Sequence, residues 1–147
     1  MGLKAYLALA GVAFLAATTG ADLVARTAIA GEPLAVALRE HLYWEGVQFV
    51  GTILLLAPFV VVALVCARAE KQARSRSVVL IFMAAMLTLL YYYFQGHQGA
   101  QRALLEERWT AAALSIGLLP FFTGIPVVLA SCCAAVLATK FDPRMSD

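Results

Sequence analysis

Four long apolar runs, separated by short charged segments, constrain the fold of this chain more than any other feature. They cover residues 3–21, 47–67, 78–94 and 111–138, and Lys4 is the one charged residue within them. Apolar runs of about 18 residues or more are candidates for membrane crossing. A backbone inside a bilayer must satisfy its own hydrogen bonds, and the alternation typical of a barrel strand is absent. We therefore expect each run to be a transmembrane helix.

The composition agrees with a bilayer as the surrounding solvent. Of the 147 residues, 63% are hydrophobic and 14% are charged, whereas soluble domains are about 45–50% apolar and about 25% charged. A soluble chain of this length could not bury such an excess, so the apolar surface is expected to face lipid. The sequence thus predicts an all-α polytopic membrane protein, a bundle of four transmembrane helices in one domain, residues 1–147.

The segments between the apolar runs complete this prediction. We expect an outer loop holding a short amphipathic helix at about residues 33–46, a basic loop at 68–77, a second outer loop at 95–110, and a tail at 139–147. Lys4, the apolar core after it and the small residues near Thr18 to Ala21 are also features of a signal peptide. We expect this first run to be retained as a membrane anchor.

The distribution of charge predicts how the chain is threaded. One set of segments holds seven basic and three acidic residues, a net charge of +4, and the other holds four basic and six acidic residues, a net charge of −2. Because Lys and Arg concentrate on the cytoplasmic side, both termini and the loop 68–77 are expected in the cytoplasm. The Ala-rich composition favours a bacterial inner membrane. The basic loop satisfies this topology rule without a nucleic-acid partner.

The two halves of the chain resemble each other weakly. A shift of 66 residues aligns Glu40 with Glu106, Gly51 with Gly117 and Cys66 with Cys132, within seven identities over residues 37–66. This pattern suggests two tandem units, each a helix, an outer segment and a second helix. Because both units would begin and end on the same side, the repeat would be parallel.

The outer segments carry most of the chemically active side chains. Pro33 stands where the first turn of a helix would begin, and residues 101–109 are expected to form a similar amphipathic lead-in to the fourth membrane helix. Gly96 and Gly99 are interpreted as the turn before it. His41 and His97 are interpreted as solvated residues at the membrane surface; the alternative is that they meet and form a metal or substrate site with outer glutamates. The candidate contact residues for a partner or ligand are Arg39, Glu40, His41, Tyr43, Trp44, Glu45, His97, Arg102, Glu106, Arg108 and Trp109.

The membrane interior offers few ionisable groups. Asp22, at the outer end of the first run, has Arg26 one helical turn later as its natural partner. Prolines and glycines predict a break in the fourth helix and a kink in the second, because proline removes a backbone donor and glycine adds freedom. The candidate break residues are Pro58, Gly117, Pro120, Gly124 and Pro126. The three cysteines are interpreted as small packing residues.

These features favour a non-enzymatic integral membrane protein. We expect a subunit or accessory protein of a membrane or envelope complex, which contacts partners through its outer loops and helix faces. One alternative is a small oligomeric transporter or channel with the Pro120–Pro126 break lining the path; a second is a membrane enzyme acting on a lipid or quinone. We expect no catalytic residue, metal or cofactor. The expected partners are the lipid bilayer and another membrane protein or a second copy of the chain.

Overall fold

The computed structural model describes residues 2–47 and 49–143, and the described chain is helical over nearly all of its length. In chain order the segments are α1 (Leu3–Leu15), the π-helical segment η1 (Ala16–Gly20), α2 (Ala21–Ala28), α3 (Leu34–Val47), α4 (Phe49–Ala69), α5 (Ser75–Leu105), α6 (Trp109–Gly117), the π-helical segment η2 (Pro120–Gly124) and α7 (Ile125–Phe141).

These segments join into helical stretches that are long and apolar enough to cross a membrane. In the described residues there are four, at Leu3–Ala28, Phe49–Ala69, Arg76–Leu105 and Trp109–Phe141. They contain 26, 21, 30 and 33 residues, and about 20 residues suffice to span a bilayer. The predicted fold class, an all-helical multi-pass membrane protein with four spanning helices, is confirmed.

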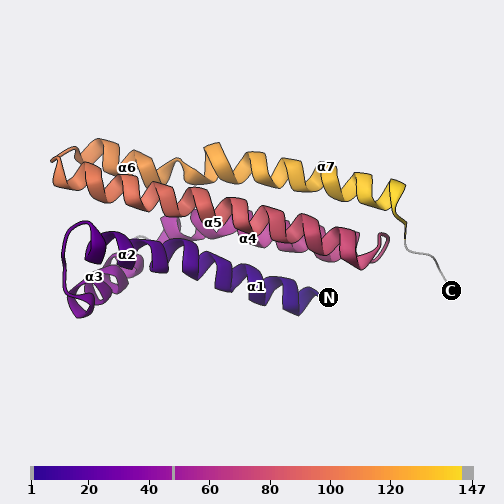
Figure 1. Ribbon diagram of the computed structural model, residues 1–147, viewed down its shortest axis with the longest axis horizontal. Helices are drawn as coiled ribbons and strands as arrows, with labels where there is room; N and C mark the ends of the chain where they lie inside the picture. Colours follow the sequence, from indigo (N-terminus) through magenta and orange to yellow (C-terminus); the bar gives the residue numbers. More distant parts are fainter. Residues whose placement is uncertain (1, 48, 144–147) are drawn as a thin grey trace.

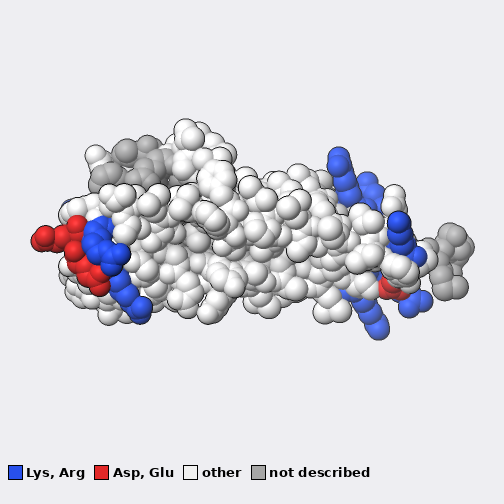
Figure 2. All heavy atoms as spheres, turned by 90° about the horizontal axis from the view of Figure 1, so that it is seen from above, with Lys and Arg blue, Asp and Glu red and all other residues white. Residues whose placement is uncertain are grey.

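The four stretches run lengthwise beside one another (Figure 1). The start of α1 and the end of α7 lie at one end of the bundle, whereas α2, α3 and the turn between α5 and α6 lie at the other. Charged side chains gather at these two ends, with a wide uncharged band between them (Figure 2). The band is the surface expected to face lipid, because ionisable groups are costly in the hydrocarbon region.

Aromatic side chains hold the interior of the bundle together. Tyr6 packs edge-to-face on Phe82 with ring centroids 4.9 Å apart, and Phe59 does the same with Tyr93 at 5.2 Å. The Tyr93 hydroxyl donates a hydrogen bond of 3.2 Å to the Leu55 carbonyl. Such contacts join α1, α4 and α5, and edge-to-face pairs add about 0.5–1.5 kcal/mol beyond their buried area.

The third membrane helix is longer than the sequence predicts. Residues 78–94 were expected to form it, with a turn at Gly96 and Gly99, but α5 continues through both glycines to Leu105. The turn comes at residues 106–108, where Glu107 has a φ of 59°. The prediction of an outer loop at 95–110, with a helical lead-in at 101–109, is therefore wrong. Glycine does not end a helix when neighbouring helices support the backbone.

Gly96 allows two helices to approach closely instead of forming a turn. A Cβ atom at this position would lie 2.7 Å from a Leu119 methyl carbon and 3.1 Å from the Ser115 carbonyl oxygen. Small residues commonly serve this purpose between membrane helices. The consequence is a long contact between α5 and α6.

The fourth membrane helix is broken where the sequence predicts. α6 ends at Gly117, the π-helical η2 covers Pro120–Gly124, and Pro126 stands in the first turn of α7. Pro58, by contrast, lies inside a continuous α4. Its ring packs directly against Gly124, where a Cβ atom would overlap it. The break thus lies where η2 packs against α4.

The two segments that the sequence predicts as outer loops are built differently. In the first half the segment forms a separate helix, α3, which confirms the short helix expected at 33–46. The corresponding residues of the second half end α5 and begin α6 without a helix of their own. The tandem pattern in the sequence therefore has no counterpart in the structure of the outer segments.

Candidate functional site: a partly buried ionic cluster

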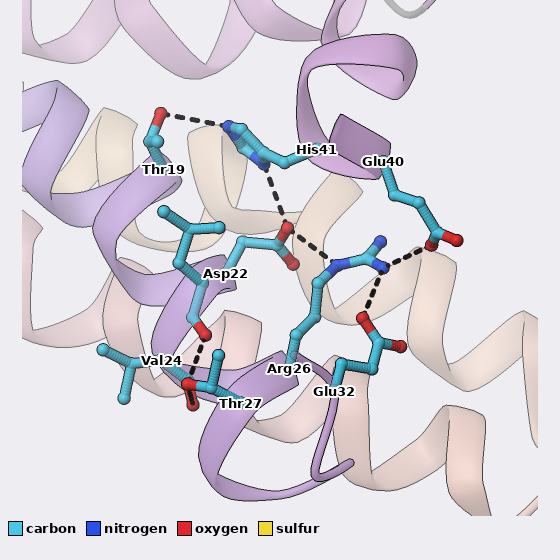
Figure 3. Close-up of polar contacts among 9 residues, drawn as sticks. Thr19, Asp22, Val24, Arg26, Thr27, Glu32, Glu40 and His41 are labelled. Atoms are coloured by element: carbon cyan, nitrogen blue, oxygen red, sulfur yellow. Dashed lines mark hydrogen bonds and ion pairs between the residues drawn. The ribbon is translucent and has the colours of Figure 1, made fainter. Parts of the chain in front are cut away.

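Arg26 is the centre of an ionic cluster at the end of the bundle that holds α2 and α3. Its Nε atom donates to Asp22 Oδ2 at 3.0 Å, and its Nη1 atom lies 2.8 Å from Glu40 Oε2 and 3.4 Å from Glu32 Oε2. The arginine side chain is 15% exposed. Figure 3 shows the guanidinium group between Asp22 on one side and the two glutamates on the other. The Asp22–Arg26 pair expected from the sequence is confirmed.

His41 joins the same cluster from α3. Its Nδ1 atom lies 3.0 Å from Asp22 Oδ2, and its Nε2 atom lies 3.0 Å from the Thr19 hydroxyl (Figure 3). A neutral imidazole with its proton on Nδ1 would donate to the carboxylate and accept from the hydroxyl, which uses both ring nitrogens. Thr19 lies in η1, and single-turn π-helical segments occur often at functional sites.

His97 approaches the cluster from α5. It is 8% exposed, and it lies close enough to Asp22 to interact with the carboxylate electrostatically, as His41 does. His41 therefore contacts the Asp22 carboxylate directly, whereas His97 acts on it only through its electrostatic field. The interpretation of both as solvated surface residues is wrong, because His41 is only 5% exposed. His41 and His97 are far apart in the sequence, and His97 comes near Asp22 because α5 packs against α2.

Six of the remaining predicted contact residues have described side chains on the surface. Tyr43 and Trp109 are 66% and 69% exposed, and Glu106 forms a 3.0 Å ion pair with Arg108 in which both side chains are exposed. Arg39 and Arg102 are also exposed. The side chains of Trp44 and Glu45 lie outside the described residues. The predicted set thus divides into buried members, His41 and His97, the partly buried Glu40, and an exposed rim.

Four members of the cluster were absent from the predicted contact set: Thr19, Asp22 and Arg26 from the first membrane stretch, and Glu32 from the segment before α3. The spacing of Asp22 and Arg26 was a usable signal, because residues four apart share a helix face. Glu32 and Glu40 carried no comparable signal, since they meet Arg26 only when α3 folds back beside α2.

The cluster contains more acid than base. Asp22, Glu32 and Glu40 face a single guanidinium, so with neutral histidines the net charge is −2. Among the described residues, no three His, Cys, Asp or Glu side chains are grouped in a way that could hold a metal ion. What the geometry does provide is a set of charge-assisted hydrogen bonds, which fix α3 to the end of the bundle.

A second feature is a groove of about 620 Å³ beside the helix break. It lies between α5 and the η2–α7 segment, and it is lined mainly by apolar side chains with Thr88, Thr123 and Ser131 among them. The Thr88 and Ser131 hydroxyls donate to carbonyls of their own helices, Ala84 at 2.8 Å and Val127 at 2.7 Å. These two hydroxyls are thus engaged in the helix backbone.

The fold and the cluster define a class: a four-span helical membrane protein with an ionic cluster at one end of its bundle. No protein-family model, no curated protein sequence and no solved structure matches the chain.

Proposed function

We propose that the protein is a non-enzymatic subunit or accessory protein of a membrane complex. It would reside in the inner membrane of a bacterium, with both termini in the cytoplasm and the ionic cluster at the outer face. The charge difference between the two ends supports this orientation. A reporter fused behind Asp147 that is active only in the periplasm would contradict it.

One observation carries the proposal of a partner. At the outer end the acids Asp22, Glu32 and Glu40 are engaged with Arg26, whereas arginine and aromatic side chains at the same end remain exposed. Exposed Arg, Tyr and Trp side chains are the usual anchors of protein interfaces. The exposed rim consists of Arg39, Tyr43, Arg102, Arg108 and Trp109.

The rigidity of the helices that carry the rim also supports the proposal. Arg39 and Tyr43 project from α3, which the Arg26–Glu40 and Asp22–His41 contacts hold in place. Trp109 begins α6, at the same end of the molecule (Figure 1). A rim on rigid helices loses little conformational entropy when a partner binds.

Loss of a rim aromatic should weaken partner binding. Tyr43→Ala or Trp109→Ala is expected to lower the affinity about 30-fold, equivalent to about 2 kcal/mol, because aromatic anchors contribute at that level. Affinity would be measured on the complex purified from the native host in mild detergent. The matched control is Phe141→Ala, which removes an exposed aromatic from the opposite end.

Photo-crosslinking gives the outcome that would contradict the proposal. A photoreactive phenylalanine analogue at position 43 or 109 should give an adduct of one defined mass, and the same analogue at position 141 should not. Equal adduct yields at all three positions, with the chain recovered alone, would mean that the rim does not bind a partner.

The helix break supports a second candidate, a small oligomeric transporter. The groove beside η2 favours a transporter, since discontinuous membrane helices often line binding sites. If Pro120→Ala and Pro126→Ala left flux into proteoliposomes unchanged, a transport path along the helix break would be contradicted.

A further inference from the structure

The helix α3 presents chemically distinct sides to its surroundings. Ala37 and His41, four residues apart, are buried against the bundle. Leu34, Leu38 and Leu42 form a neighbouring stripe along the helix, and these leucines are 62%, 41% and 63% exposed. A row of exposed leucines on an otherwise anchored helix needs an apolar environment to cover it.

The side of α3 opposite the leucines is charged. Successive residues of an α-helix are rotated by about 100°, so Leu38 and Glu40 project about 160° apart. Glu40 is bound to Arg26, in the ionic cluster at the end of the bundle. The leucine stripe therefore points away from the charged end of the molecule, toward the level at which the uncharged band begins.

The start of α4 indicates how deep α3 lies relative to the lipid bilayer. α3 ends at Val47, and α4, a membrane span, begins at Phe49. Phe49 and Val50 are 66% and 72% exposed, as expected where a spanning helix enters the hydrocarbon region. The last leucine of the stripe, Leu42, thus stands seven residues before Phe49 in the chain, where a surface expected to face lipid begins.

Two polar residues of α3 fix the depth and rotation of the helix. Glu40 binds Arg26, and His41 binds Asp22 and Thr19, all of them in the first membrane stretch. In Figure 1, α3 lies obliquely to the long helices at this end of the bundle. A helix held in this way can lie in the membrane surface, with one flank against the bundle and another in the lipid.

We propose that α3 is an interfacial helix that inserts Leu34, Leu38 and Leu42 into the boundary between headgroups and acyl chains of the adjacent leaflet. Interfacial helices bury an apolar face at this depth and keep their polar face in water. Lipid therefore covers the leucine stripe, and the ionic cluster fixes the rotation of the helix about its axis. The proposal holds for either orientation of the protein in the membrane and requires no protein partner.

Spin labelling in vesicles tests it. The starting variant carries Cys66→Ala, Cys132→Ala and Cys133→Ala, and single cysteines are introduced by Leu38→Cys, Leu42→Cys and Arg39→Cys. The labelled protein is reconstituted into vesicles of phosphatidylethanolamine and phosphatidylglycerol. Collisions with molecular oxygen report lipid, and collisions with a water-soluble nickel chelate report water. Native Cys133, exposed on α7, provides the lipid-facing reference in a variant that keeps it alone.

Labels at positions 38 and 42 should collide with oxygen several times more often than with the nickel chelate, and the label at position 39 should show the reverse. Nickel accessibility at position 38 equal to that at position 39 would overturn the proposal, because the leucines would then face water. Labels at 38 and 42 that are immobile and shielded from both reagents would overturn it as well, since a protein surface would cover the stripe.

Discussion

Replacing Arg26 with methionine is expected to lower the free energy of unfolding by about 3 kcal/mol, because it leaves the largely buried Asp22 carboxylate without its cation. This expected loss lies at the low end of the range for breaking a buried ion pair, since the Glu40 side chain is 45% exposed and water still reaches it. Methionine keeps the length and the apolar stem of the side chain, so the loss reports mainly on charge. The measurement is denaturant unfolding in mild detergent.

A matched control and a rescue make this result decisive. Arg39→Met removes an exposed arginine from α3 and should change stability by no more than about 0.5 kcal/mol. Adding Asp22→Asn to Arg26→Met should recover part of the loss, because the uncompensated carboxylate is then absent. Equal effects of Arg26→Met and Arg39→Met would show that the cluster does not hold α3 in place.

Gly124→Ala should be the most damaging single-methyl addition in the membrane region, at a cost of about 2 kcal/mol. The added Cβ atom would overlap the Pro58 ring, which is rigid and lies inside α4. The helices α4 and α7 would then have to separate, and overpacking of this kind costs about 1–3 kcal/mol. Thermal unfolding in detergent measures the loss.

Gly117→Ala is the corresponding control, because a Cβ atom there would meet nothing within 4 Å. The double variant Pro58→Ala with Gly124→Ala should lose less stability than the two single changes together, since removal of the ring makes room for the methyl group. Strict additivity would mean that Pro58 and Gly124 do not touch in the folded protein.

Local sequence features predicted the elements whose cause is local. The four apolar runs predicted the four spans, Pro33 marked the start of the helix that became α3, and Pro120 and Pro126 marked the broken helix. Each of these depends on the solvent around a segment or on its own backbone donors. The same reasoning placed a turn at Gly96, because glycine frequently ends soluble helices. Inside a bundle its missing side chain serves the contact with Leu119 instead.

The candidate site could be predicted only where its residues share one helix turn. Asp22 and Arg26 satisfy that condition, whereas His41 and His97 come from helices that meet through tertiary packing. Their burial follows from the same packing, because α3 folds back on α2 while α5 extends past the predicted membrane boundary.

The sequence by itself determined that lipid surrounds this protein, how many times the chain spans the membrane and how charge is distributed between its ends. Hydropathy and charge are read along the chain without reference to distant residues. The tertiary structure alone decided which polar groups meet. Whether Asp22 contacts only Arg26 or also His41 depends on how the helices pack, and that packing is set by the shapes of many apolar side chains together.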